Sequence, residues 1–213
     1  MIFHGYFRSS AAWRCRIAFN LKGLQPDDTH FVHLRRGGGE QKSEVYRSIN
    51  PQGLVPALET DAGVLTQSLA IIEYIDQVHS GPKLLPADPF EQARVRAFAL
   101  AIASDIHPLH NLRVLSYLSE NLGINQDQRD EWCRHWIKAG LEACEQLSDG
   151  ASRYCFGDHP TLADVCLVPQ LGAAERFGLA VTEFPKLVSI ANRCNEMEAF
   201  RDAVPGRQPD AEV

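Results

Sequence analysis

The sequence lacks the features expected of a nucleic-acid-binding or membrane protein. Its 213 residues carry 21 Lys and Arg against 27 Asp and Glu, a formal charge of −6, without a dense basic run. Phosphate contacts need clustered cations, so we expect no nucleic-acid partner. No apolar run reaches the length of a membrane span. The N-terminus shows no basic region followed by an apolar one. We therefore expect a cytoplasmic protein with no membrane partner.

The sequence also lacks cysteines paired as CxxC. Its six cysteines are Cys15, Cys133, Cys144, Cys155, Cys166 and Cys194. This usage favours reduced, buried thiols over a disulfide framework. Cys133 and His135 are two possible metal ligands, and two ligands do not make a site. We predict six reduced thiols and no metal.

Strand and helix patterns alternate over the first 81 residues. The expected strands are 2–6, 29–34, 54–58 and 64–66, and the expected helices are 10–22, 43–49 and 69–78. A helix between the first two strands implies a parallel pair with a right-handed crossover. The tight turn Asp61-Ala62-Gly63 implies an antiparallel pair. The order βαβαββα is that of a thioredoxin-like domain.

The composition changes around residues 80–88, where glycine and prolines interrupt the apolar pattern. We place a linker at 82–87, between a thioredoxin-like domain at 1–81 and a second domain at 88–213. Strand patterns almost vanish in the second domain. Its helices are expected from Pro89 to about Asn121, from Asn125, from Thr161 to Gly178, and from Pro185. The predicted fold class is α/β plus all-α, with a C-terminal helical bundle.

Arg8, Ser9 and Ser10 stand where the first strand gives way to the first helix. A helix N-terminus has unsatisfied N–H groups and a positive dipole end. A serine there can cap the helix, and its hydroxyl can also donate to an anion. Thioredoxin-like folds often carry a redox CxxC at this turn, and this sequence has none. A site that favours a thiolate but lacks its own predicts a thiolate supplied by a cofactor, and glutathione is the obvious candidate.

Two further segments fit a peptide-like cofactor. Val55-Pro56 precedes the third strand, where a cis proline would expose a backbone edge to an extended peptide. Gln67 and Ser68 start the last helix of the first domain, and its N–H groups suit a carboxylate. Taken alone, Ser68 is only a helix cap.

Several motifs in this order are similar to those of one known family. They are Ser9-Ser10-Ala11-Ala12-Trp13-Arg14-Cys15-Arg16-Ile17-Ala18-Phe19, Asn50-Pro51, Leu54-Val55-Pro56-Ala57-Leu58, Gln67-Ser68-Leu69-Ala70-Ile71-Ile72-Glu73-Tyr74, Pro108-Leu109-His110-Asn111-Leu112-Arg113, Thr161-Leu162-Ala163-Asp164 and Arg207-Gln208-Pro209-Asp210. Over nearly its whole length the chain resembles the zeta-class glutathione transferases. Each motif is weak alone, and the ordered set is specific.

The resemblance implies roles for the first-domain residues and a homodimer. Ser9 would support the glutathione thiolate, and Ser10 would assist it. Val55 would pair with the cysteinyl backbone, and Gln67 and Ser68 would hold the γ-glutamyl end. The chain departs from the family at Ala11, where cysteine is usual. We expect this change to alter affinity and to leave the activity in place.

The resemblance implies a glutathione-dependent cis–trans isomerase. Reversible thiolate addition turns a double bond into a single bond that can rotate. The leading expectation is conversion of maleylacetoacetate to fumarylacetoacetate in tyrosine and phenylalanine breakdown. Three alternatives stay open: maleylpyruvate isomerisation in a gentisate pathway, a transferase or dehalogenase acting on halo-acids, and a binding protein without catalysis.

A keto-diacid substrate also needs cations for its carboxylates and polarisation of its enolate oxygen. Arg8, beside Ser9, is the best candidate because a guanidinium matches a carboxylate. From the second domain, Arg113 and Arg176 are hypothesised to complete the dicarboxylate pocket. Asp105, His107 and Asn111 are hypothesised to reach the glutathione site, and a structural or solvated role is the alternative for His107. Arg14 and Arg16 are interpreted as structural ion pairs.

Overall fold

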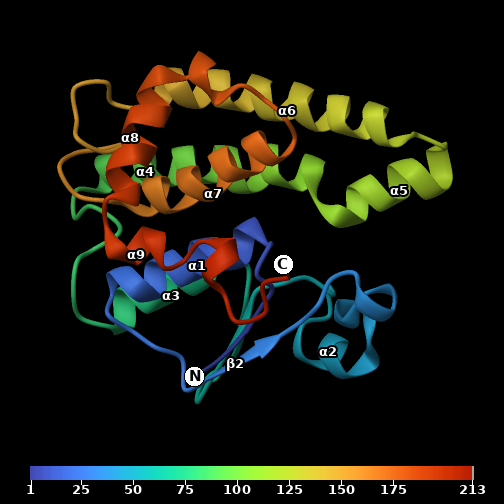
Figure 1. The fold of residues 1–213 in the computed structure, drawn as a ribbon. Coiled ribbons are helices and arrows are strands. Elements are labelled where there is room, and N and C mark those ends of the chain that lie inside the picture. The colour runs from blue at the N-terminus through green and yellow to red at the C-terminus, as the bar shows by residue number, and fades with distance from the viewer. Residues whose placement is uncertain (213) are drawn as a thin grey trace. The chain divides into compact units, whose positions relative to one another are not determined.

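A computed structural model describes residues 1–212 of the chain. It divides into two compact units. Unit 1 consists of Met1–Leu84 together with the C-terminal residues from Glu196 onward, and unit 2 is Leu85–Asn195. Figure 1 shows the elements of both units, which are described separately below.

Unit 1 has the predicted βαβαββα order. Its strands are β1 (Ile2–Gly5), β2 (Asp28–Phe31), β3 (Ala57–Thr60) and β4 (Gly63–Thr66). Its helices are α1 (Ser10–Leu21), α2 (Glu44–Ile49), α3 (Ser68–Val78) and α9 (Glu198–Arg201), with short 3₁₀ turns η1 (Arg36–Gly38), η2 (Glu40–Lys42) and η6 (Pro205–Arg207). The strands are shorter than predicted. In β3 the ladder begins only after Pro56, which has no N–H to donate.

The four-stranded sheet has the order β2-β1-β3-β4. β1 and β2 are parallel, whereas β3 is antiparallel to both β1 and β4. Both predicted strand pairings are therefore confirmed. The turn between β3 and β4 is held by Thr60, whose hydroxyl donates to the carbonyl of Gly63 at 2.9 Å and accepts from the N–H of Ala62 at 3.2 Å.

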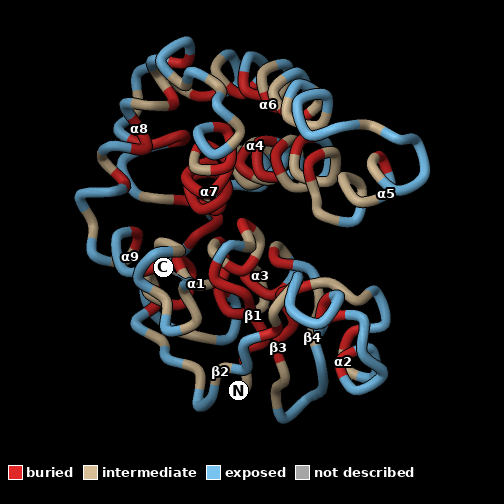
Figure 2. Tube along the Cα trace, turned by 45° about the vertical axis from the view of Figure 1, so that its right-hand side comes forward, coloured by how far each residue is buried: buried red, intermediate tan, exposed pale blue. Residues whose placement is uncertain are grey.

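The core of unit 1 lies on both faces of this sheet. On one face Phe3 of β1 packs edge-on against Phe19 of α1, with ring centroids 5.2 Å apart. On the other face Tyr46 of α2 joins a buried cluster with Tyr6 and Val32. Figure 2 shows the burial of β1 and β3 between these layers.

The C-terminal residues attach to α1 of unit 1. Asn20 donates to the carbonyl of Ala199 at 2.9 Å, and Arg16 donates to the carbonyl of Ala203 at 3.0 Å. Figure 1 shows α9, in red, beside α1, in blue. The predicted division placed these residues in the second domain because their helical pattern continues that of α8. Long-range hydrogen bonds, which the pattern does not reveal, attach them to the first unit instead.

Unit 2 is helical throughout, as predicted. Its elements are α4 (Pro89–Leu100), η3 (Ala101–Ile106), η4 (His107–His110), α5 (Leu112–Leu122), α6 (Gln126–Leu147), α7 (Leu162–Arg176), η5 (Val181–Glu183) and α8 (Pro185–Asn195). The predicted starts of α4, α6, α7 and α8 are confirmed.

The prediction of one helix from Pro89 to about Asn121 is wrong. The chain passes from α4 into a π-helical turn, η3, and then into the 3₁₀ turn η4. Pro108 has no N–H for an α-helical ladder. Asn111 then starts α5, with its side chain accepting from the N–H of Arg113 at 3.1 Å. An internal cap therefore divides what the apolar pattern predicts as one helix.

The helix α7 forms the centre of the unit 2 core. Every residue from Leu162 to Leu171 is buried, and Figure 2 shows α7 in red. Its start is a capping box in which Thr161 and Asp164 bond to each other's backbone N–H groups. The predicted capping-box geometry is thus confirmed, with Asp in place of the usual Glu.

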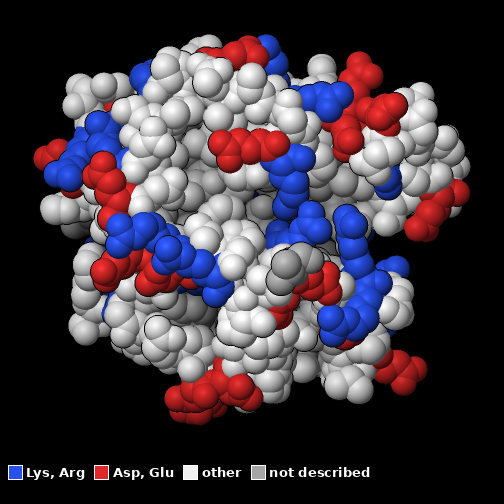
Figure 3. All heavy atoms as spheres, viewed as in Figure 1, with Lys and Arg blue, Asp and Glu red and all other residues white. Residues whose placement is uncertain are grey.

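The predicted thiol state is confirmed, because all six cysteines are buried and none is in a disulfide. Burial raises the pKa of Cys133 to about 11 and that of Cys144 to about 12. Among residues 1–212, no helix has both the length and the apolar content to cross a membrane. On the face shown in Figure 3, acidic and basic side chains are interspersed.

Candidate functional site

Ser9 occupies the N-cap position of α1. Its Oγ accepts a hydrogen bond from the N–H of Ala12 at 3.1 Å, and its carbonyl accepts from Trp13 at 2.8 Å. A hydroxyl has two acceptor lone pairs and one donor hydrogen. The cap uses one lone pair, so the O–H remains available to donate to an anion. Capping therefore leaves the donor hydrogen of the same group unused.

The neighbours of Ser9 differ in accessibility. Arg8 is exposed, Ser9 and Ala11 are half-buried, and Ser10 is only 4% exposed. The charge of Arg8 reaches the nearby phenol of Tyr6: burial raises the pKa of Tyr6, and Arg8 partly offsets this. Among the two serines, Ser9 is thus the one better placed to meet a ligand from solvent.

Arg16 fixes the turn that leads to Ser9. It donates to the carbonyl of Phe7 at 3.0 Å, to that of Tyr6 at 3.5 Å and to that of Ala203 at 3.0 Å. Burial lowers the pKa of Arg16 to about 10, while the charge of Asp210 opposes the decrease. The structural role predicted for Arg16 thus rests on carbonyl groups, with Asp210 as a nearby charge.

The C-terminal segment also supports the turn that leads to Ser9. The carboxylate of Asp210 accepts a hydrogen bond from the N–H of Phe7 at 2.9 Å. The pairing joins residues 203 positions apart in the sequence. Asp210 therefore supports the backbone immediately before Arg8.

Arg14 links α1 to the start of α3. It is 1% exposed, and its Nη1 donates to the hydroxyl of Ser68 at 3.3 Å. The sequence analysis interpreted Arg14 as a structural ion pair that points along its own helix. Its contact with Ser68 also places it in direct support of a candidate site residue.

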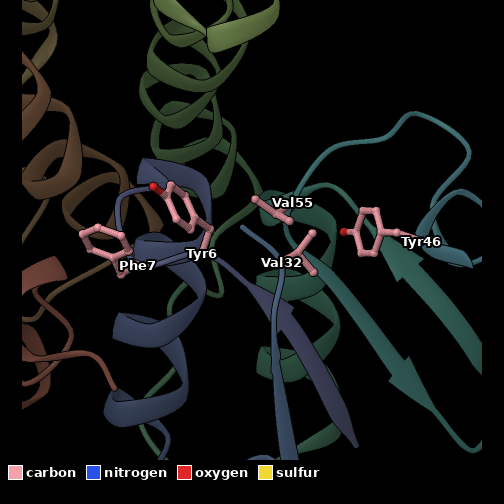
Figure 4. Packing of buried hydrophobic residues seen from close by; sticks show 5 residues of the cluster. All are labelled: Tyr6, Phe7, Val32, Tyr46 and Val55. Carbon is pink, nitrogen blue, oxygen red and sulfur yellow. The ribbon is translucent and has the colours of Figure 1, made fainter. Parts of the chain in front are cut away.

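The peptide bond between Val55 and Pro56 is cis, as the sequence analysis proposed. The preceding carbonyl of Leu54 is held by the hydroxyl of Tyr46 at 2.7 Å and by the amide of Asn50 at 2.6 Å. In Figure 4, Val55 and Val32 lie between Tyr6 and Tyr46. Two hydrogen bonds therefore hold the backbone immediately before Val55.

The start of α3 is unlike that of α1. Gln67 is its N-cap residue and has φ of 70°, a left-handed conformation that is uncommon for residues other than glycine. Its side chain makes no capping bond and donates instead to Oε1 of Gln52 at 2.8 Å. Ser68 is the first helical residue, so its predicted role as the cap is wrong. The first turn of α3 is thus left without a side-chain cap.

Sequence reasoning missed Gln41, which lies in a buried position after the glycine-rich loop. Its Nε2 donates to the carbonyl of Leu34 at 3.2 Å, and its Oε1 has no partner among residues 1–212. Gly39 has φ of 105°, and a Cβ there would lie 2.6 Å from the Gln41 amide. The run of three glycines was the available signal, because only glycine permits this approach.

The predicted unit 2 residues lie on three neighbouring segments. Asp105 is exposed on the π-helical turn, and His107 begins η4, where its ring contacts that of His110 at 5.1 Å between centroids. His110 is buried against the amide of Gln170. The Asn111 side chain is engaged as the cap of α5. His107, His110 and Asn111 thus each have a contact within unit 2, whereas Asp105 is an exposed carboxylate.

The two predicted unit 2 arginines belong to different helices. Arg113 is exposed in the first turn of α5. Arg176 is exposed at the end of α7, and its guanidinium stacks over the ring of Phe177 at 5.1 Å. Both side chains are accessible to an anion from solvent.

Comparison with known proteins connects these features to one family. The family models for the glutathione S-transferase N-terminal domain and the glutathione S-transferase C-terminal domain match residues 8–78 and 126–190. A maleylacetoacetate isomerase of Pseudomonas aeruginosa is 47% identical, covering 99% of this chain and 98% of its own. The holo structure of maleyl pyruvate isomerase, described as a bacterial glutathione S-transferase in the zeta class, is 42% identical with a TM-score of 0.94, covering 100% of both chains. The chain belongs to the zeta class of the glutathione S-transferases.

A third relative has been solved with glutathione bound. The crystal structure of maleylacetoacetate isomerase from Anaeromyxobacter dehalogenans, with glutathione bound in its active site, is 41% identical with a TM-score of 0.87. It covers 99% of this chain and 97% of its own. The predicted glutathione transferase fold is thereby confirmed.

The N-terminal family model covers more of the candidate site residues than the C-terminal model does. The N-terminal model of the glutathione S-transferases includes Arg8, Ser9, Val55, Gln67 and Ser68. The C-terminal model includes Arg176 and begins after Arg113. The segment 105–113 thus lies between the two matched regions.

Proposed function

We propose that the protein is a glutathione-dependent cis–trans isomerase that converts maleylacetoacetate to fumarylacetoacetate. The observation that carries the proposal is the half-buried Ser9 hydroxyl at the start of α1, whose O–H is left available by the cap. It stands in a chain 47% identical to a maleylacetoacetate isomerase. Bound glutathione supplies the thiolate that adds reversibly to the double bond of the substrate.

Ser9 has the central role in this proposal. Donation of a hydrogen bond to a charged group favours that charge, so the Ser9 O–H lowers the pKa of a thiol beside it. The positive end of α1 acts in the same direction. Ser10, buried behind Ser9, assists by maintaining the polarity of the turn.

The start of α3 binds the other charged end of glutathione. A γ-glutamyl carboxylate suits the uncapped first turn of α3, with Ser68 as a hydroxyl donor and Gln67 as an amide donor. A non-glycine residue in the left-handed region costs about 1–3 kcal/mol and is typical of ligand-binding positions. The backbone at Val55 pairs with the cysteinyl unit, and Asp105, His107 and Asn111 contribute from the second unit.

Arginines neutralise the substrate carboxylates. Arg8 adjoins Ser9 in sequence and is exposed, so it is the first choice. Arg113 and Arg176 provide the second cation and stabilise the charge that develops on the enolate oxygen.

The proposal also includes a pathway, a cellular location and an oligomeric state. The isomerase acts in tyrosine and phenylalanine breakdown, in the cytoplasm, as a homodimer. The zeta-class similarity supports these settings, and the interspersed surface charge agrees with a small-molecule substrate in place of nucleic acid. Sedimentation velocity on the purified chain tests the dimer.

Maleylpyruvate isomerisation is the second candidate. It is favoured by the 42% identical zeta-class structure described under that activity. The chemistry is the same on a shorter keto-diacid, so the two substrates must be compared directly. A transferase or dehalogenase acting on halo-acids, or a protein without catalysis, are the further alternatives.

The deciding experiment follows the ultraviolet absorbance of each maleyl substrate with purified protein. We expect faster conversion of maleylacetoacetate, dependence on glutathione, and no rescue by mercaptoethanol at equal concentration. Equal rates with mercaptoethanol would contradict the assigned roles of Gln67 and Ser68. Faster conversion of maleylpyruvate would make it the preferred substrate.

Substitution of the arginines tests whether the protein is an isomerase or a transferase acting on halo-acids. Arg8→Met, and at least one of Arg113→Met and Arg176→Met, should lower kcat/KM by about ten- to a hundredfold, because a hydrogen bond to a charged group contributes roughly 1.5–3 kcal/mol. Lysine at the same positions should recover only part of the loss. If all three variants keep full activity on both keto-acids, the halo-acid alternative becomes the better one.

A further inference from the structure

A second group of polar side chains lies on the sheet of unit 1. His4 of β1 and His30 of β2 are direct partners in the parallel pair. Glu59 of β3 stands two residues beyond Ala57, the partner of His4, and therefore shares its face of the sheet. Three neighbouring strands thus each contribute one possible metal ligand.

This group lies on the face opposite α1. Phe3, the neighbour of His4, packs on Phe19 of α1. The His4 ring contacts Tyr46 of α2 at 5.9 Å and His30 at 4.9 Å between centroids. None of the residues proposed to bind glutathione belongs to the group, so the two sites are separate in composition.

The three residues are close enough to share one ion. One ligand atom from each lies within 4.8 Å of the other two. Nε2 of His4 and Oε1 of Glu59 are 2.6 Å apart. Zinc bonds of about 2.0–2.2 Å in a tetrahedron separate neighbouring ligand atoms by about 3.4 Å. Small side-chain rotations therefore bring the three atoms to ligating distance.

Burial divides the group into a fixed part and an adjustable part. The His4 side chain is 2% exposed, whereas those of Glu59 and His30 are 35% and 51% exposed. His30 is also oriented by Asp28, with Nε2 and Oδ2 at 3.0 Å. An outer carboxylate of this kind commonly orients a ligating imidazole.

We propose that His4, His30 and Glu59 bind a divalent transition-metal ion. Two imidazoles and one carboxylate suit zinc and its neighbours, whereas calcium and magnesium prefer oxygen ligands. The fourth tetrahedral position is left to water, because Asp28 orients His30 from outside. The sequence does not indicate this site, because its ligands are far apart along the chain. The bound ion would join β2, β1 and β3.

The test titrates the full chain, without a polyhistidine tag, with Zn²⁺ against a chromophoric chelator after metal removal. We expect one equivalent to bind and to raise the melting temperature, because an ion that binds only the folded state stabilises it. Substitution of Co²⁺ should give the intense visible bands of a tetrahedral site.

Variants identify the ligands. His30→Ala changes an exposed group and Glu59→Gln keeps the size of a half-buried one, so both should fold, and each should weaken binding by about tenfold or more. His135→Ala, at an exposed histidine of unit 2, is the matched control and should bind as the wild type does. The proposal is overturned if the wild type binds no Zn²⁺ in competition with the chelator. It is equally overturned if His30→Ala and Glu59→Gln retain the affinity of the control.

Discussion

The helices α7 and α3 begin in opposite ways. The start of α7 is saturated by its own side chains: Asp164 accepts from the N–H of Cys155, and from the N–H and hydroxyl of Thr161, at 2.8–2.9 Å. The start of α3 has no side-chain cap, and Gln67 holds a left-handed backbone there. One N-terminus has an internal carboxylate, and the other is suited to a carboxylate from outside.

Under the proposed function, the difference separates a structural helix start from one that binds a ligand. Both segments contain the residue types that favour helix starts, so composition does not distinguish them. What distinguishes them is which group satisfies the first-turn N–H groups. The start of α1 is intermediate, because Ser9 caps the helix and keeps a donor for a ligand.

Among substitutions at these helix starts, Asp164→Ala is expected to have the largest effect, a loss of stability. It leaves three buried donors without their acceptor, and each unsatisfied group costs about 1–3 kcal/mol. We expect the free energy of unfolding to fall by about 3 kcal/mol or more, measured by urea denaturation. Asp127→Ala, in the exposed first turn of α6, is the control and should cost less than about 1 kcal/mol. Equal losses would mean that the α7 cap is not exceptional.

Ser9 is expected to give the next largest effect, on catalysis. Ser9→Ala should lower kcat/KM by about a hundredfold, because removal of one aligned donor has effects of this size. It should also raise the pKa of bound glutathione, which a thiolate absorbance titration measures.

Glycine at the same position separates the cap from the chemistry. Ser9→Gly should lose activity as Ser9→Ala does, yet only a few tenths of a kcal/mol of stability, because glycine is tolerated at an N-cap. Ser10→Ala is the comparison for the pKa. If it moves the thiol pKa more than Ser9→Ala, the roles of the two serines are reversed.

Glycine in place of Gln67 should weaken glutathione binding and yet suit the left-handed backbone of the folded state. Gln67→Gly and Gln67→Ala both remove the side-chain amide, so both should weaken glutathione binding by about tenfold or less. Glycine suits the left-handed backbone, so the Gly variant should be more stable than the Ala variant by about 1 kcal/mol. Calorimetric titration and urea denaturation measure the two quantities. An Ala variant as stable as the Gly variant would contradict the strain at this position.

The smallest effect is expected at Ala11. Ala11→Cys restores the residue usual in the zeta class on a half-buried position beside Ser9. Glutathione affinity should change only a few-fold, and product analysis should show the same reaction. A new product would show that this position helps to choose the reaction.

The sequence predicted local features well and long-range ones poorly. The capping box at Thr161 and the antiparallel β3–β4 pair follow from neighbouring residues, and both are confirmed. The cis bond before Pro56 was expected from the thioredoxin-like fold and is also confirmed. The conformation of Gln67 was missed because no residue type there requires it. The contact of Arg14 with Ser68 was missed because the two residues are 54 positions apart.

The attachment of the C-terminal segment also gives unit 1 an order of assembly. During synthesis, residues up to 84 precede the whole of unit 2, and Ala203 and Asp210 follow it. At about 5–20 residues per second, Asp210 is added roughly 6–25 s after residue 84. Over that interval the turn before Ser9 lacks two of its supports. The nascent chain therefore acquires a fully held Ser9 turn only after its helical unit has been made, and the thiol activation proposed for Ser9 would be among the last properties that it gains.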